Sequence, residues 1–247
     1  MSFLDVTLGA GMAFVATALG AAGVFGMKKT QPRHYSLILA FAAGVMVFSA
    51  AEMLGQSYSE AGQAYALAGF LCGMAALLLL ERMLPHAHAF LSRREIGHPG
   101  KKAVLVAGTI ALHNIPEGFA IASAFALSPT LGWAVSVSIA LQDIPEGLVT
   151  SAPLAYYGLP VRKSFLWGAF SGLVEFLAAV FGYYFLSLVR GATPFALAFS
   201  AGAMAYLVFF ELLGESIRNG GPHKAGLAFL AGAAAALCIT ALLSFGL

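Results

Sequence analysis

The stretch LHNIPEG, Leu112–Gly118, and its near copy LQDIPEG, Leu141–Gly147, decide how the rest of this sequence is interpreted. Both heptads lie inside long apolar stretches, yet each carries a proline and ionisable side chains. Of the 247 residues, 60% are hydrophobic and only 10% are charged, whereas a soluble domain has about 25% charged residues. We therefore expect an all-α integral membrane protein in which the two heptads are exceptions that need a reason.

Eight stretches are apolar and long enough to cross a bilayer, which takes about 20 helical residues. Short polar segments, or segments with Gly and Pro, separate them, and the longest is a loop at about 83–101. We predict a single transmembrane domain over residues 1–247, with spans at about 5–26, 34–55, 62–82, 102–126, 131–157, 162–188, 193–214 and 222–246.

Basic residues fall almost entirely on one set of alternate loops. Of the 13 Lys and Arg residues, only Arg190 lies on the opposite set, which leaves twelve after spans one, three, five and seven or at their edges. Cytoplasmic loops retain positive charge in multi-pass proteins. The sequence therefore predicts that both termini face outward and that the long loop lies in the cytoplasm.

Five of the eleven acidic residues lie well within the predicted spans, namely Glu117, Asp143, Glu146, Glu175 and Glu211. A carboxylate at this depth is costly unless it is paired or faces water, so it indicates function by default. No Lys or Arg lies at a matching depth in the predicted spans, so internal salt bridges do not account for these acids. Two alternatives remain, which are binding of protons and binding of metal cations.

The spacing within each heptad favours metal. His113 and Glu117 are four residues apart, and Asp143 and Glu146 are three apart, so each pair shares one face of a helix. Imidazole together with carboxylates suits Zn²⁺ and other divalent first-row ions. Four carboxylates balance the charge of two such ions, and we hypothesise a two-metal cluster near the midplane formed around Glu117, Asp143, Glu146 and Glu175.

The prolines of the heptads fit a polar cavity. Pro116 and Pro145 lack an N–H and clash with the preceding turn, so we expect them to break their helices and to free the carbonyls one turn earlier. Free carbonyls are tolerated at membrane depth where they line a cavity. Gly118 and Gly147 are expected to let these helices approach their neighbours closely.

On these residues the chain resembles the ZIP (Zrt/Irt-like) family of divalent metal transporters, and its bacterial members in particular. The likeness rests on HNIPEG in span four, QDIPEG in span five, Glu175 in span six and the eight-span layout. It implies a multi-pass protein of the bacterial inner membrane that carries divalent ions into the cytoplasm, zinc above all, with Cd²⁺, Fe²⁺ and Mn²⁺ as further substrates. It also implies a 3+2+3 bundle, in which spans one to three and six to eight form an inverted repeat around spans four and five.

The resemblance implies two neighbouring metal sites that share Glu146 as a bridge. The first would use His113, Glu117 and Glu146, with Gln142 and Met53 as further candidates. The second would use Asn114, Asp143, Glu146 and Glu175.

Three further residues are candidates for an exit route. Glu211, towards the inner end of span seven, could hand the ion to the cytoplasm, or could be an ordinary helix end that reaches water. His86 and His88 in the long loop form a pair that could bind metal weakly or stand inert at the surface.

Other classes of function fit the sequence less well. An intramembrane metal-dependent hydrolase is the alternative, but a catalytic zinc usually has two or three His ligands, and this sequence has one His in the cluster and no H-E-x-x-H motif. A proton-coupled carrier of an organic solute is a second alternative. We expect no enzymatic activity, divalent metal ions and the lipid bilayer as partners, and no nucleic acid. A homodimer stays open, because the stretch GAAGVFG, residues 20–26, could pack between subunits or within one.

Overall fold

The computed structural model describes residues 1–26, 35–83, 99–156, 158–189 and 191–246, although it gives no account of some side chains there, chiefly those of residues 99–112. The described residues form helices joined by short turns, and no strand occurs among them. The all-α prediction is confirmed. In chain order the helices are α1 (Phe3–Ala22), α2 (Tyr35–Ala61), α3 (Gln63–Met83), α5 (Pro99–Leu127), α6 (Pro129–Tyr156), α7 (Val161–Leu188), α8 (Thr193–Leu207), α9 (Leu213–Gly220) and α10 (Pro222–Gly246).

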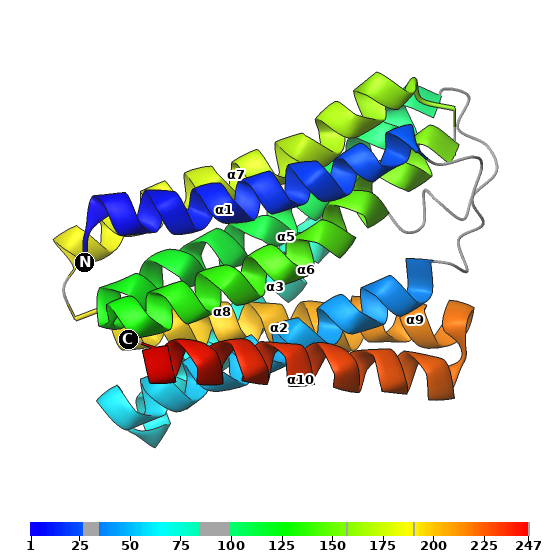
Figure 1. Ribbon diagram of the computed structural model, residues 1–247. Helices are drawn as coiled ribbons and strands as arrows, with labels where there is room; N and C mark the ends of the chain where they lie inside the picture. The colour runs from blue at the N-terminus through cyan, green and yellow to red at the C-terminus, as the bar shows by residue number, and fades with distance from the viewer. Residues whose placement is uncertain (27–34, 84–98, 157, 190, 247) are drawn as a thin grey trace.

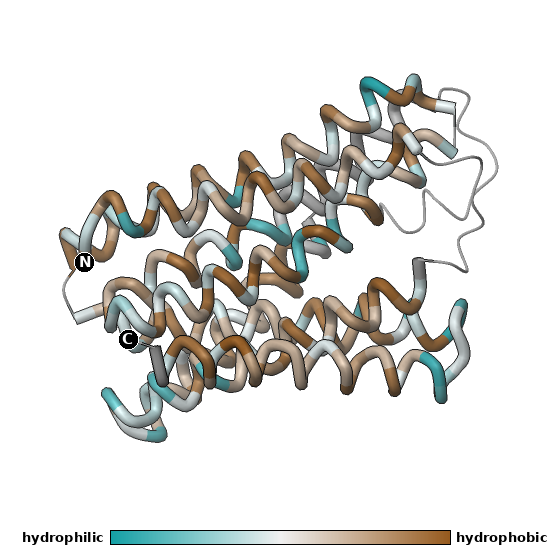
Figure 2. The backbone as a smooth tube through the Cα atoms, viewed as in Figure 1, coloured by the Kyte–Doolittle hydropathy of each residue, from teal (hydrophilic) through white to brown (hydrophobic). Residues whose placement is uncertain are grey.

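Most of these helices have the length and composition of membrane spans. Among the described residues six segments qualify, namely α1, α2, α3, α7, α10 and the rod that α8 and α9 form together. The helix α6 is 28 residues long, but the polar side chains of its heptad interrupt its apolar run, as the hydrophilic residues in the middle of the bundle in Figure 2 illustrate. The chain is a polytopic membrane protein, and the count of eight spans stays a prediction.

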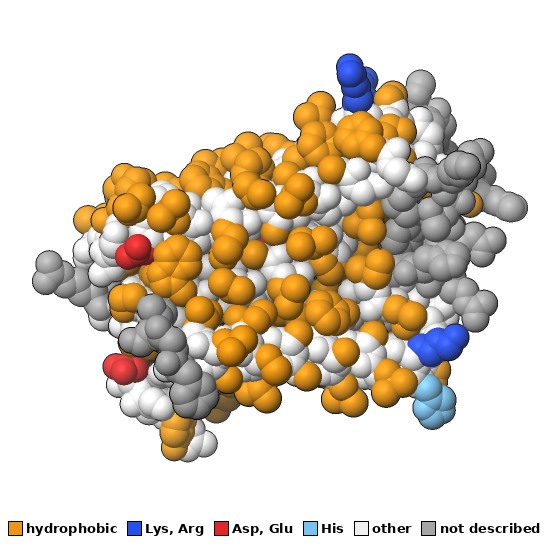
Figure 3. All heavy atoms as spheres, viewed as in Figure 1, with side chains coloured by type: hydrophobic (Ala, Val, Ile, Leu, Met, Phe, Trp, Pro, Cys, Tyr) orange, Lys and Arg blue, Asp and Glu red, His pale blue; other side chains and the backbone are white. Residues whose placement is uncertain are grey.

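The surface is organised in bands along the bundle. On the face that Figure 3 shows, hydrophobic side chains cover the middle, acidic side chains lie at the end near the two termini, and Lys, Arg and His lie at the opposite end. This distribution agrees with the predicted orientation, in which the termini face outward and the basic end faces the cytoplasm.

The helices are grouped in two four-helix units, which Figure 1 shows one above the other. The helices α1, α5, α6 and α7 pack mainly on one another, and we call them the motif unit because α5 and α6 carry the two heptads. The helices α2, α3, α8–α9 and α10 form the second group, which we call the flanking unit. The units meet where α5 contacts α8 and where α2 contacts α6.

The main contacts between helices are symmetric: each of them has a counterpart when the helices are exchanged in pairs. The helix α1 packs on α6 as α7 packs on α5, α3 packs on α8 as α10 packs on α2, and α2 contacts α6 as α8 contacts α5. Exchanging α1 with α7, α2 with α8, α3 with α10 and α5 with α6 leaves this set of contacts unchanged. An inverted repeat of three helices around a central pair produces this pattern, so the packing is consistent with the predicted 3+2+3 arrangement.

The last glycine of each heptad is a point of close helix contact. A Cβ at Gly147 would meet the carbonyl of Thr17 in α1, and a Cβ at Gly118 would meet the carbonyl of Glu175 in α7. Only glycine lets the backbones approach in this way. The predicted close approach is confirmed, and it fixes both heptads against their neighbours within the motif unit.

One local prediction is wrong. The helices α5 and α6 continue through Pro116 and Pro145 instead of breaking there; each proline removes one backbone donor, and packing on both sides maintains the helix. The helix α2 continues beyond the predicted span end near residue 55 to Ala61, because the polar residues after that point are compatible with a helix. It ends at Gly62, which has φ +82°, a conformation that glycine adopts readily at a helix C-terminus.

Candidate metal centre

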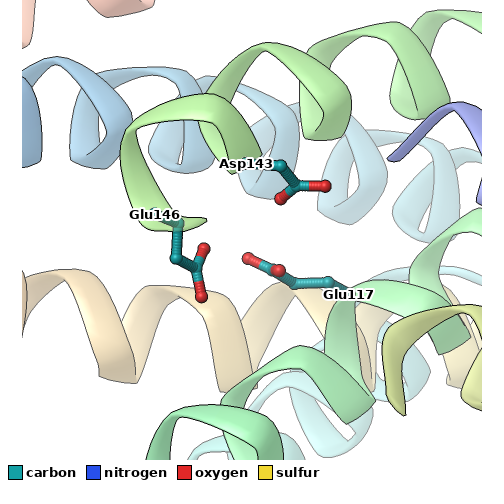
Figure 4. Close-up of side chains that lie close together, drawn as sticks. All are labelled: Glu117, Asp143 and Glu146. Carbon is teal, nitrogen blue, oxygen red and sulfur yellow. The ribbon is translucent and has the colours of Figure 1, made fainter. Parts of the chain in front are cut away.

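Three carboxylates from the two heptads converge inside the motif unit. One ligand oxygen from each of Glu117, Asp143 and Glu146 lies within 4.8 Å of those of the other two. Figure 4 shows Glu117 of α5 pointing towards Asp143 and Glu146 of α6. Glu117 and Asp143 are buried, and Glu146 is half-buried. Carboxylates this close repel one another unless protons or cations lie between them.

A fourth carboxylate, that of Glu175, joins the cluster from α7. Its side chain is fully buried, and it lies close enough to Asp143, Glu117 and Glu146 to interact with them electrostatically. The backbone contact at Gly118 explains this position, because it presses α5 against the turn of α7 that carries Glu175. Spans four, five and six thus each supply acids to one place.

Two buried amide side chains, those of Asn114 and Gln142, belong to the same heptads as the carboxylates. The Nε2 atom of Gln142 donates a hydrogen bond of 2.7 Å to Oε1 of Glu117. The Oε1 atom of Gln142, the Oε2 atom of Glu117 and both polar side-chain atoms of Asn114 are buried without a hydrogen bond. A buried polar atom without a partner is costly. A divalent cation bound by these oxygens would remove that cost, so the donor set fits a metal ion.

The basic residues whose side chains the structure describes do not neutralise this charge. Among the residues that the structure describes, no Lys or Arg forms an ion pair with any acid of the cluster. The cation side chains that are described lie at the helix ends, where Arg162, Lys163 and Arg218 are exposed. No salt-bridge network among the described side chains therefore explains the buried acids.

His113, the histidine of the first heptad, contacts the flanking unit. The Nε2 atom of His113 lies 3.4 Å from Oε1 of Glu211, and their side chains are 7% and 16% exposed. Glu211 lies in a π-helical segment, Val208–Leu212, between α8 and α9. Single π-turns inside α-helices often occur at functional sites. The acid predicted near the exit thus lies beside a predicted ligand.

The remaining candidates are a methionine of α2 and two histidines of the long loop. Met53 is fully buried in α2 and belongs to the apolar core, so its role as a ligand stays a prediction. His86 and His88 lie outside the described residues. Thr17, whose side chain lies beside Asp143, was not predicted, because one threonine in an apolar span gives no distinguishing signal.

Fold and site together define a class, a polytopic helical membrane protein with an acidic, metal-competent site buried among its spans. Comparison with known proteins gives the family. The model of the ZIP zinc transporter family matches residues 91–240. The zinc transporter ZIPB of Bordetella bronchiseptica is 34% identical over 242 aligned positions, which cover 91% of this chain and 77% of that protein.

Two further bacterial relatives agree. The zinc transporter ZupT of Stenotrophomonas maltophilia is 32% identical, with 93% of this chain and 91% of that protein covered. The zinc transporter GufA of Myxococcus xanthus is 34% identical over 68% of this chain and 67% of its own length. The chain belongs to the ZIP zinc transporter family, and the resemblance drawn from the heptads is confirmed. These relatives are named as transporters and not as enzymes.

Proposed function

We propose that this protein transports zinc, and related divalent ions, across the bacterial inner membrane into the cytoplasm. The observation that carries the proposal is the convergence of Glu117, Asp143 and Glu146 on one point inside the motif unit, where no Lys or Arg that the structure describes pairs with them. The names of the bacterial relatives support zinc as the substrate. Mixed nitrogen and oxygen ligands also suit Cd²⁺, Fe²⁺ and Mn²⁺, so these ions are further candidates.

The four carboxylates of the cluster carry enough negative charge to balance two divalent ions. In the arrangement we propose, Glu146 bridges two metal positions, since it shares a point with Glu117 and Asp143. The first position takes His113 and Glu117, with Gln142 and Met53 as further ligands. The second takes Asn114, Asp143 and Glu175.

The two units suggest how the site reaches both sides of the membrane. The four clustered carboxylates all belong to the motif unit, whereas Glu211 belongs to the flanking unit. A shift of one unit against the other would change which side the cluster faces while it keeps its ligands together, which is alternating access. Glu211, beside His113, is positioned to take the ion as it leaves for the cytoplasm.

Zinc uptake into proteoliposomes tests the proposal, with the variant Glu146→Gln against the wild type. Glu146→Gln keeps the size of the side chain but removes a charge from the centre of the cluster, and we expect uptake to fall by at least about tenfold, as loss of a metal-site group does. Glu60→Gln is the matched control, because Glu60 is an exposed acid at the end of α2; its uptake should equal that of the wild type. Wild-type uptake by Glu146→Gln would contradict the proposal.

A further inference from the structure

An apolar cavity of about 570 Å³ lies between the two units. Its walls come from α3 and α8 of the flanking unit and from α5 and α7 of the motif unit. Every described residue that lines it is Gly, Ala, Val, Leu, Ile, Pro or Phe. Its volume lies within the range of about 300–1,000 Å³ that holds small organic ligands, so it is a site of useful size rather than a packing defect.

The cavity lies at the depth of the hydrocarbon core. Ala76 and Leu177, which line it, are both well inside their helices, α3 (Gln63–Met83) and α7 (Val161–Leu188). Both helices have the length and composition of membrane spans. Lining residues at mid-helix are therefore surrounded by lipid tails and not by headgroups or water.

The cavity is open to the outer surface of the bundle. Three of its lining side chains are exposed, with 41% of Ile115, 56% of Leu177 and 65% of Phe181 accessible. An apolar surface at this depth faces the bilayer, so the opening is lateral and an occupant can enter from the membrane.

The chemistry of the lining selects the occupant. Water has no polar atoms to bond in such a space, and apolar cavities of this kind stay dry. A polar or charged ligand would lose its hydration without any compensating hydrogen bond. We propose that the cavity is a binding site for one acyl chain of a membrane phospholipid, held between the motif unit and the flanking unit.

The packing exchange between the two halves supports this inference. The counterpart of the cavity would lie between α10, α6, α1 and α2, and there α10 packs against α6. Among the described residues, α3 and α5 make no contact of comparable extent. An acyl chain in the cavity fills the gap that the direct helix contact closes on the other side.

The position of the cavity connects lipid to transport. Pro116, which lines it, directly precedes the cluster acid Glu117. The bound chain touches both units, so a shift of one unit against the other must displace or deform it. This consequence rests on the proposed function, whereas the binding of lipid does not.

Filling the cavity tests the proposal. Ala76→Trp places an indole in the cavity, and Ala75→Trp is the matched control, because Ala75 is exposed on the same helix and does not line the cavity. The readout is the number of phospholipids retained by the purified protein in native mass spectrometry. We expect Ala76→Trp to lose one lipid per chain relative to Ala75→Trp and the wild type. Equal lipid numbers in all three proteins would overturn the proposal.

A measurement on the unmodified chain guards against misfolding of the variant. Wild-type protein in bilayers that contain phosphatidylethanolamine with a photoreactive diazirine in mid-chain is illuminated, and the labelled peptides are mapped. Labels should concentrate on α3 and α7 at the cavity; a uniform spread over the outer helix faces would refute the site. Joining of two protein chains at the cavity by a bifunctional crosslinker, tested separately on the wild type, would also refute it, since the occupant would then be a second copy.

The two proposals fail separately. Lipid retention and labelling do not require transport, so a wild-type protein without zinc uptake would refute the proposed function and leave the lipid site standing. If both hold, zinc uptake by Ala76→Trp should be slower than uptake by Ala75→Trp, because the indole, unlike an acyl chain, cannot leave the space when the units shift.

Discussion

The motif unit and the flanking unit each combine helices from both halves of the repeat, but among the described side chains only the motif unit buries carboxylates. Glu117, Asp143 and Glu175 are buried there, and Glu146 is half-buried beside them. The large side chains that the flanking unit buries are apolar, for example Leu77, Leu197 and Met204. The same repeat thus builds both units, and the chemistry of the site comes from the side chains placed on one of them.

Both units depend equally on glycine for close helix contacts. In the flanking unit a Cβ at Gly202 would meet the carbonyl of Phe70, just as a Cβ at Gly147 would meet that of Thr17 in the motif unit. The units therefore differ in what they bind and agree in how they are held together. Substitution of the contact glycines tests whether both units are held together in the same way. Substitution of the acids tests whether only the motif unit binds metal.

The largest effect is expected from acids of the motif unit. Asp143→Asn and Glu175→Gln each remove a charge from the buried cluster, and we expect zinc uptake to fall by at least about tenfold. In the flanking unit, Glu52 accepts a 3.2 Å hydrogen bond from Thr240 and lies apart from the cluster, so Glu52→Gln should keep most of the uptake. Equal losses of zinc uptake in the motif-unit and flanking-unit variants, measured in proteoliposomes, would contradict the assignment of the metal site to the motif unit.

The glycine contacts come next. Gly202→Ala and Gly147→Ala should each destabilise the fold by about 1–3 kcal/mol or more, because an added methyl group has no room. Gly214→Ala is the matched control in α9, where a Cβ meets nothing within 4 Å, and it should stabilise the helix by up to about 1 kcal/mol. Thermal unfolding in detergent measures all three. Destabilisation by Gly147→Ala alone would mean that the flanking unit is held in another way.

A smaller effect is expected where the units meet. Glu211→Gln leaves the cluster intact and removes the charged partner of His113, so zinc should still bind while its release to the cytoplasm slows. We expect a several-fold fall in the maximal uptake rate with little change in KM, measured from the zinc dependence of uptake. A change in KM alone would assign Glu211 to binding rather than release.

The smallest effect is that of pH on the wild-type protein. Metal ligands bind in their deprotonated form, so protons compete with zinc and metal binding releases protons. Acidic medium should therefore reduce zinc uptake, and the reduction should be relieved by raising the zinc concentration. Uptake that rises in acid, in vesicles without a membrane potential, would instead indicate that protons drive transport.

The sequence predicted which acids converge, but it did not predict the contacts that join the two units. Glu117, Asp143 and Glu146 converge because spacings of three and four residues place heptad side chains on one helical face, and the duplicated heptad marks two helices that belong together. The continuity of α5 through Pro116 was missed, because a rule for isolated helices ignores support from neighbours.

Other features had no signal in the sequence. The contact between Glu211 and His113 depends on a π-helical segment, which shifts the register by one residue and defeats a 3.6-residue periodicity. The cavity between α3 and α5 likewise depends on a departure from the packing exchange. Sequence patterns report the shared geometry of a repeat and do not report where its two halves differ.

The central claim is that the acids of spans four, five and six hold divalent cations, and X-ray diffraction at the zinc absorption edge from zinc-soaked crystals tests it most directly. Strong anomalous peaks should lie among Glu117, Asp143 and Glu146, with a second maximum towards Glu175. Crystals that bind zinc only at exposed side chains, and show no peak among these four carboxylates, would contradict the account.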